Sequence, residues 1–68
     1  MTLMRINGVE AEVEVTTLAE LLVVRGVDPA ARFLAIAVNG AVVRRREWAS
    51  RALSPGDTVE IVRPLQGG

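Results

Sequence analysis

Apolar and acidic residues alternate strictly between positions 9 and 15 of the chain. One side of this run carries Val9, Ala11, Val13 and Val15, and the other carries Glu10, Glu12 and Glu14. A period of two predicts a β-strand with one face in the core and three carboxylates in water. Asn7-Gly8 joins this run to an apolar run at 2–6, and Asn-Gly is typical of a two-residue hairpin turn because both positions take positive φ. The first fifteen residues are therefore expected to form a β-hairpin.

The apolar spacing changes to a helical one in "TTLAELLVVRG", residues 16–26. Thr17 and Glu20 have the spacing of a capping box, in which each side chain accepts a backbone hydrogen bond from the other residue. Gly26 suits the position just after a helix, because it adopts positive φ without strain. The predicted apolar stripe consists of Leu18, Leu21, Leu22, Val23 and Val24.

The second half of the chain repeats the hairpin signal and ends in another strand. Asn39-Gly40 supplies the second hairpin turn. Pro64 removes a backbone donor, so the last strand is expected to stop before it. The elements expected here are a turn or single helical turn at 27–33, strands at 33–38 and 41–45, a helical turn within 46–53, a turn at 54–57 and a strand at 58–62.

This order of elements predicts an α+β fold, with a mixed sheet of four to five strands, one main helix across one face and a short helical turn. The first and last strands are expected to lie side by side in the middle of the sheet, with the helix as a crossover. Sixty-eight residues suffice for one domain. We expect that domain at 1–63, followed by a flexible C-terminal tail at 64–68.

The composition excludes most kinds of chemistry. The chain has no cysteine and no histidine, which removes thiolates, disulfides, the usual general base and the usual metal ligands. Eight arginines balance eight carboxylates, so no net charge favours nucleic acid or an anionic membrane. No apolar run approaches the about 20 residues of a membrane span, and the N-terminus lacks the layout of a signal peptide. We expect a cytoplasmic protein with no bound cofactor or metal.

Three stretches carry a resemblance to the ubiquitin-like β-grasp proteins, and among them to the ThiS family of sulfur carriers. They are "AIAVNGAVVRRREW" at 35–48, "LSPGDTVEIVRPLQ" at 53–66, and the terminal Gly67-Gly68. Together with the order of elements they cover essentially the whole chain. One departure is visible, because the family often has proline before the arginine that aligns with Arg45, and this chain has Arg44 there.

The last two residues have no side chains, which suits a narrow tunnel in another protein. Five residues from Pro64 to Gly68 reach at most about 16–18 Å when extended. A frayed chain end is the simple alternative. The resemblance implies that an activating enzyme adenylates the Gly68 carboxylate with ATP and magnesium of its own. A persulfide donor then supplies the sulfur of a thiocarboxylate, which passes to a thiazole synthase.

The resemblance also implies partners that hold the domain, a ThiF-like activating enzyme and a ThiG-like thiazole synthase. The face beside the last strand is the expected contact surface. Phe33 and Ile61 have packing in the core as an alternative role, and Arg44, Arg45 and Arg46 form either a solvated run or a patch that docks on an acidic partner. The expected partner-binding residues are Gly67, Gln66, Leu65, Pro64, Val62, Ile61, Phe33 and Arg45.

Three other functions remain open at this stage. The nearest is a molybdopterin-type sulfur carrier, which shares the terminal chemistry and differs in the acceptor. The second is a ubiquitin-like modifier that is conjugated to lysines of target proteins. The third is a β-grasp binding module without chemistry at the C-terminus. In each of them the chain is expected to be a substrate or a ligand of other proteins and not an enzyme.

Overall fold

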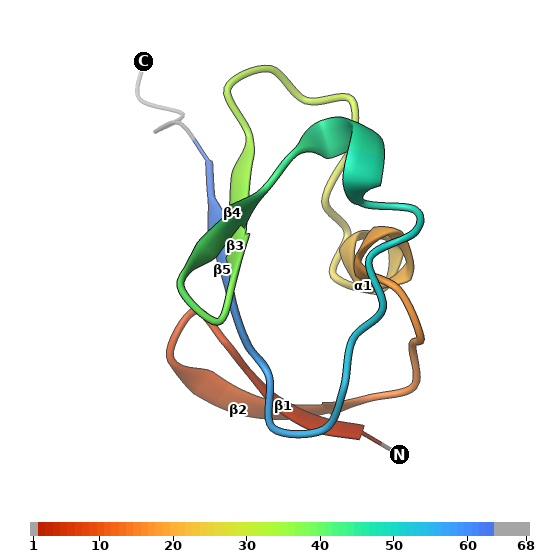
Figure 1. Cartoon of the computed structure of the whole chain (residues 1–68), viewed down its shortest axis with the longest axis vertical. Coiled ribbons are helices and arrows are strands. Elements are labelled where there is room, and N and C mark those ends of the chain that lie inside the picture. Colours follow the sequence, from red (N-terminus) through yellow and green to blue (C-terminus); the bar gives the residue numbers. More distant parts are fainter. Residues whose placement is uncertain (1, 64–68) are drawn as a thin grey trace.

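The computed structural model describes residues 2–63. Five strands, one α-helix and one 3₁₀ turn follow one another in this range (Figure 1). In chain order they are β1 (Thr2–Ile6), β2 (Val9–Val13), α1 (Leu18–Val24), β3 (Ala35–Val38), β4 (Ala41–Val43), the 3₁₀ turn η1 (Arg45–Glu47) and β5 (Thr58–Val62).

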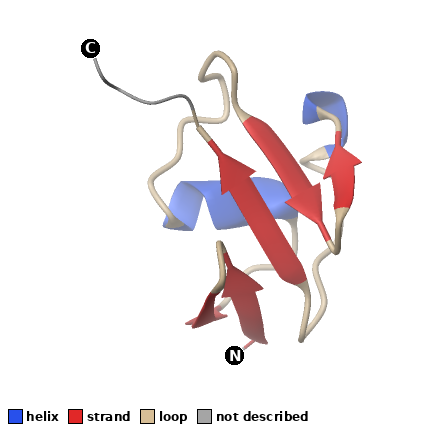
Figure 2. Cartoon of the chain, turned by 90° about the vertical axis from the view of Figure 1, so that its left-hand side faces the viewer, coloured by secondary structure: helices blue, strands red, loops and turns tan. Residues whose placement is uncertain are grey.

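The five strands form one mixed sheet in the order β2-β1-β5-β3-β4. The outer pairs β1–β2 and β3–β4 are antiparallel hairpins, and the central pair β1–β5 is parallel. Helix α1 crosses one face of the sheet, behind the strands in Figure 2. The α+β prediction is therefore confirmed, and so is the expectation that the first and last strands lie side by side in the middle.

The core lies between the sheet and α1. The inner face of the sheet buries alternate residues of its strands, as a half-buried sheet requires. The helix contributes Leu18, Leu21 and Leu22, all fully buried. Trp48 is buried too, and its indole N–H donates to the carbonyl of Val43 at 2.9 Å, which meets the need of a buried indole for an acceptor.

Helix α1 begins at the predicted capping box and ends at the predicted glycine. The capping box forms, because the Thr17 hydroxyl accepts from the backbone N–H of Glu20 and the Glu20 carboxylate accepts from that of Thr17. Gly26 has φ +72°, and the N–H of Val27 donates to the carbonyl of Leu22 at 2.8 Å. This pattern of hydrogen bonds past a left-handed glycine closes the helix as a Schellman motif.

The structure corrects three details in the first half of the chain. Strand β2 ends at Val13 instead of 15, because β1 begins opposite it at Thr2 and offers the later residues no partner. Val9 is exposed although its alternation placed it inside, since it directly follows the Asn7-Gly8 turn at the start of the edge strand β2. Val23 and Val24 do not widen the buried stripe, because both are exposed on the outside of the last helical turn.

The bounds of three elements differ in the second half. The segment 27–33 forms turns, one of its two expected alternatives, but β3 begins only at Ala35 instead of 33. Strand β4 ends at Val43, and the helical turn begins at Arg45, earlier than the predicted 46–53. Arg44, which stands where the ThiS family often has proline, has φ −70° and ψ 147°. Proline requires this φ, so the chain keeps the backbone that the family residue would impose.

Candidate functional site

The terminal glycines follow β5, so the environment of this strand defines the candidate site. Val59 and Ile61 point into the core, and Ile61 is only 8% exposed. Val62 points to the opposite face and is 59% exposed. Ile61 and Val62 were both expected to contact a partner. Only Val62 lies at the surface, because Ile61 packs in the core.

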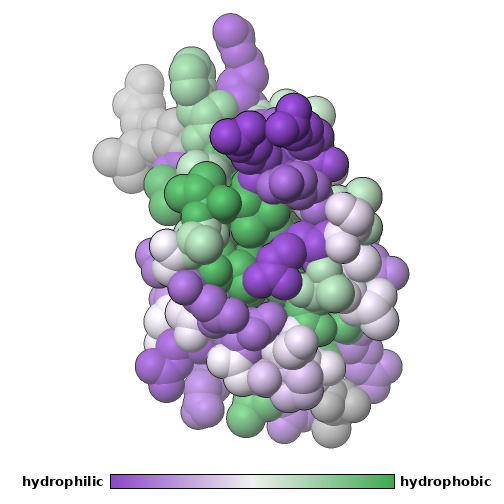
Figure 3. Space-filling model, in the orientation of Figure 1, coloured by the Kyte–Doolittle hydropathy of each residue, from purple (hydrophilic) through white to green (hydrophobic). Residues whose placement is uncertain are grey.

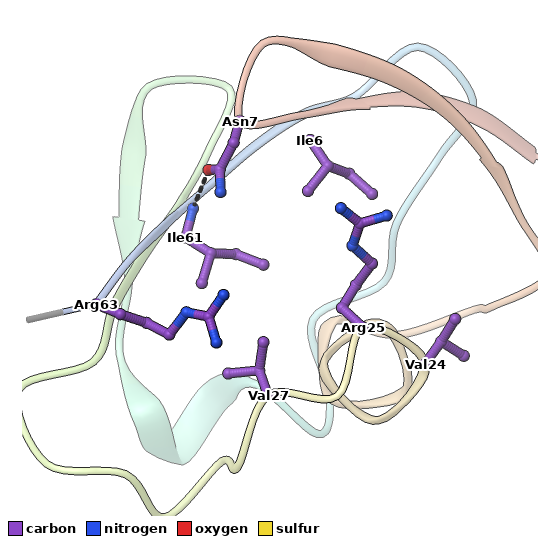
Figure 4. A pocket seen from close by; sticks show the side chains of 7 residues that line it. All are labelled: Ile6, Asn7, Val24, Arg25, Val27, Ile61 and Arg63. Carbon is purple, nitrogen blue, oxygen red and sulfur yellow. Dashed lines mark hydrogen bonds between the residues drawn. The ribbon is translucent and has the colours of Figure 1, made fainter. Parts of the chain in front are cut away.

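Each Asn-Gly turn holds one end of β5 through its asparagine side chain. Asn39 Oδ1 accepts from the backbone N–H of Thr58 at 2.9 Å, at the start of the strand. Asn7 Oδ1 accepts from the backbone N–H of Ile61 at 2.7 Å, near its end (Figure 4). Asn7 and Asn39 have φ of 51° and 53°, a conformation that asparagine tolerates well in a turn. The same two asparagines therefore form the turns and position the last strand.

The face of the sheet away from the helix carries an apolar surface beside β5, here called the outer patch. Ala35 lies opposite Val62 in the register, and Ala37 lies between Glu60 and Val42 in the neighbouring strands. Val42 is 77% exposed. Figure 3 shows hydrophobic surface around β4, with strongly hydrophilic residues next to it. The outer patch consists of Ala35, Ala37, Val42 and Val62.

Phe33 lies in the loop that leads into β3, two residues before the outer patch. Its side chain is 78% exposed, and its backbone has φ +62°. Positive φ is uncommon for a bulky residue and is kept only where the surroundings enforce it. The Arg32 guanidinium lies 5.8 Å from the centroid of the Phe33 ring. The core alternative for Phe33 is thus wrong, and its ring is presented to solvent.

Arg45 holds that loop to the 3₁₀ turn. Its guanidinium donates to the carbonyl of Pro29 and, at 2.7 Å, to that of Ala31. The same group lies 4.8 Å from the centroid of the Trp48 ring, a cation–π distance. The planar fork of arginine suits two carbonyl acceptors at once. Arg45 was expected to contact a partner. In the structure its guanidinium forms hydrogen bonds within the domain, to the loop that carries Phe33.

A cleft with two arginines lies at the carboxyl ends of β1 and β5 and was not anticipated from the sequence. Its volume is about 250 Å³. Arg25, at the end of α1, and Arg63, just after β5, both point into it (Figure 4). No sequence pattern joined them, because they are 38 positions apart in the printed sequence. The cleft is lined by Ile6, Asn7, Val24, Arg25, Val27, Ile61 and Arg63.

Two carboxylates away from this cleft have lowered pKa values. The backbone N–H and hydroxyl of Thr16, with the backbone N–H of Thr17, hold the pKa of Glu20 below its ordinary value. Slight burial of Asp57 acts to raise its pKa, but the N–H of Ser54, the Asn39 side chain and the charge of Arg51 together lower it. Both carboxylates fix turns and caps, and neither belongs to a group that holds a metal.

The remaining expected site residues, Pro64, Leu65, Gln66, Gly67 and Gly68, lie outside the described residues. Within 2–63 there is no group of three or more acidic, histidine or cysteine side chains placed to hold a metal. None of the helices in the described range is long and apolar enough to cross a membrane. Within residues 2–63, the candidate site offers exposed apolar side chains and the positive charge of arginines.

A mixed five-stranded sheet wrapped around one helix, with an apolar outer face beside the last strand, defines a β-grasp protein of the ubiquitin-like type. The sequence model of the ThiS family matches residues 2–68. The chain therefore belongs to the ThiS family, the β-grasp sulfur carriers of thiamine biosynthesis. The match extends through the terminal Gly67-Gly68.

Two solved structures from Geobacter metallireducens resemble this one throughout. The crystal structure of a thiamine biosynthesis protein (ThiS) has 26% sequence identity and a TM-score of 0.80, over 98% of this chain and 100% of that one. The solution structure of a thiamine biosynthesis protein from the same organism has 26% identity and a TM-score of 0.79, over 98% of this chain and 88% of that one. No curated protein sequence matches the chain significantly.

Proposed function

We propose that this chain carries sulfur on the carboxyl group of Gly68 and presents it to the enzymes of thiazole formation. The match of the ThiS family through residue 68 is the observation that carries the proposal. In this proposal residues 1–63 are the domain that partners hold, and residues 64–68 are the arm that enters their active sites.

The chemistry requires activation, because a carboxylate is a poor electrophile. The Gly68 carboxylate attacks the α-phosphorus of ATP, and pyrophosphate leaves. Hydrosulfide then attacks the carbonyl carbon of the acyl adenylate, and AMP leaves with the bonding electrons to give the thiocarboxylate. If a persulfide attacks instead, the product is an acyl disulfide, and a thiol must reduce it to release the thiocarboxylate. This chain supplies the reacting carboxyl group and the handle, while ATP and magnesium belong to the ThiF-like activating enzyme.

The outer patch is proposed as the surface that partners hold. Val62 and Val42 present exposed apolar side chains beside the strand that leads to Gly68, and exposed apolar patches mark interaction sites. Phe33 adds a ring from the loop before β3. Leu65 and Gln66 would extend the contact along the arm, with Pro64 and Gly67 at its two ends. The expected partners are the activating enzyme and a ThiG-like thiazole synthase, without nucleic acid or membrane.

The decisive measurement is the intact mass of the chain after incubation with its activating enzyme, ATP, magnesium and a sulfur donor. The expected result is the gain for replacement of one oxygen by sulfur, confined to a C-terminal peptide. A chain that lacks Gly68 should show no gain under the same conditions. If the full chain gains no mass with an enzyme that is active on another carrier, the proposal is wrong. Adducts on lysines of other proteins would instead identify a modifier.

Substitutions on the sheet separate the proposed handle from the rest of the surface. Val62→Ser should raise the KM for the carrier in adenylation and leave kcat unchanged, because it weakens docking and not the chemistry. Val9→Ser is the matched control, because Val9 is also an exposed valine of the sheet but lies outside the outer patch. If the two variants behave alike, the outer patch is not the contact surface.

A further inference from the structure

The cleft between Arg25 and Arg63 has no role in the proposed chemistry, yet its composition is unusual for a surface hollow. Two cations point into it from different elements, and none of the seven lining residues is acidic. Two guanidinium groups around one hollow make its potential positive, which favours an anion there. An anion that enters it gains two charge-assisted hydrogen-bond partners.

The geometry adds a third donor. Asn7 Oδ1 accepts from the N–H of Ile61 at 2.7 Å, and the amide NH₂ group has no hydrogen-bond acceptor among residues 2–63. The apolar part of the lining comes from Ile6, Val24, Val27 and Ile61. A lining that combines hydrogen-bond donors with apolar side chains suits a group that has both a carboxylate and methylene carbons. The side chains of Asp and Glu are such groups.

The size of the cleft selects among anions. A volume of about 250 Å³ lies below the about 300–1,000 Å³ of ordinary small-molecule sites. It accepts one carboxylate side chain and is too small for a nucleotide. The lining also contains no aromatic residue on which a base could stack. Arginine adds a geometric preference, since its fork of N–H groups matches the two oxygens of a carboxylate.

The position of the cleft brings its arginines close to the point where the chain leaves the sheet. Arg63 directly follows β5, and Arg25 lines the same cleft. A protein that takes up the C-terminal arm would therefore meet two positive side chains beside it, and paired opposite charges help to orient two proteins as they associate.

We propose that the cleft is a docking subsite for an Asp or Glu side chain of the protein that receives the C-terminus, held between Arg25 and Arg63. The inference rests on the proposed function, because it assigns the acid to the partner that takes Gly68. It adds to the outer patch a second, electrostatic contact around the exit of β5. The outer patch then supplies most of the buried interface area, and the contact in the cleft fixes the orientation of the domain on its partner.

The first test uses the chain alone. Its ¹⁵N-labelled arginine and asparagine side chains are titrated with a capped diglutamate peptide, with a capped diglutamine peptide as the control. The proposal predicts saturable shifts of the Arg25, Arg63 and Asn7 side-chain signals with the glutamate peptide only. Titration with inorganic phosphate tests for a small free anion. Saturation by phosphate with no response to the glutamate peptide would overturn the assignment, and so would no response to either probe.

The second test uses the activating enzyme. Arg25→Gln and Arg63→Gln should each raise the KM for the carrier roughly tenfold at low salt, with kcat unchanged, because each loses one charged hydrogen-bond partner. Arg63→Lys should recover part of the loss. Arg5→Gln removes the same charge from β1 outside the cleft and should match the original chain. Thermal unfolding of every variant establishes that it is folded.

The outcomes separate this inference from the proposed function. If the original chain is adenylated and both cleft variants match it, the cleft has no part in docking and the inference is wrong. If the original chain is not adenylated by an enzyme that is active on another carrier, the proposed function is wrong. The peptide titration then still decides whether the cleft accepts a carboxylate.

Discussion

Replacement of Asn7 tests the connection between the first turn and the last strand. Asn7 has two tasks, because its backbone adopts φ 51° and its Oδ1 accepts from the N–H of Ile61 at 2.7 Å. Asn7→Ala removes both, Asn7→Gly removes only the hydrogen bond, and Asn7→Asp keeps an acceptor and a residue that tolerates positive φ. The three variants therefore separate backbone strain from the side-chain contact.

The magnitudes follow from the two tasks. An N–H that loses its only partner in a partly buried place costs about 1–2 kcal/mol. A left-handed alanine costs about 1 kcal/mol more than glycine in the same conformation. Asn7→Ala should therefore lower the free energy of unfolding by about 2–3 kcal/mol and Asn7→Gly by about 1–2 kcal/mol. Asn7→Asp should stay within about 0.5 kcal/mol of the original chain at neutral pH.

Urea unfolding followed by the fluorescence of Trp48 measures these differences, because this buried indole is the only tryptophan. For a domain of this size each kcal/mol also shifts the thermal midpoint by about 4–8 °C. Equal stabilities of the Gly variant and the original chain would show that the contact with Ile61 contributes nothing. An Asp variant as unstable as the Ala variant would refute the argument altogether, since it keeps the acceptor.

Three further predictions concern other parts of the fold. Arg45→Gln should cost about 1 kcal/mol and speed amide exchange at 28–34, because the loop loses its contacts to Arg45, whereas Arg46→Gln should change neither; equal exchange rates would contradict this. Arg44→Pro should raise stability by about 0.4–1 kcal/mol in urea unfolding, because φ is already −70° and only a 3.4 Å hydrogen bond to Glu47 is lost. Because the folded pKa values of Glu20 and Asp57 lie below their ordinary values of 4.5 and 3.8, their contribution should be complete above about pH 4.5 and lost as pH falls through the folded values. Asp57→Asn should flatten this acid limb in unfolding measured between about pH 2 and pH 7, and an unchanged limb would count against the argument.

Local patterns were sufficient for the elements and for the topology of the sheet. Each Asn-Gly turn marked a hairpin, and Thr17 with Glu20 marked the start of the helix. These signals depend on residues close together in the chain, so they do not need tertiary information. The central position of β1 beside β5 was expected with the helix as a crossover between the hairpins, and the structure adds that the two strands are parallel.

The errors arose where tertiary contacts decide. Val23 and Val24 are as apolar as their buried neighbours, but they lie outside the stripe of α1 that packs on the core, and both are exposed. Phe33 is the largest apolar side chain of its loop, yet the hydrogen bonds of Arg45 fix the loop in a form that turns the ring outward. No spacing in the sequence could join Arg25 to Arg63, because their proximity depends on how the end of α1 packs beside the end of β5.

The anchoring of β5 at both ends has a mechanical consequence. A partner that pulls on the C-terminus transmits the force along β5, which is hydrogen-bonded to β1 on one side and to β3 on the other. The side chains of Asn7 and Asn39 add a cross-link near each end of the strand. Because these bonds run across the direction of pulling, many of them must break together before the strand slides. If partners hold the C-terminal arm as proposed, the anchored strand lets the domain stay folded while the arm passes from one enzyme to the next.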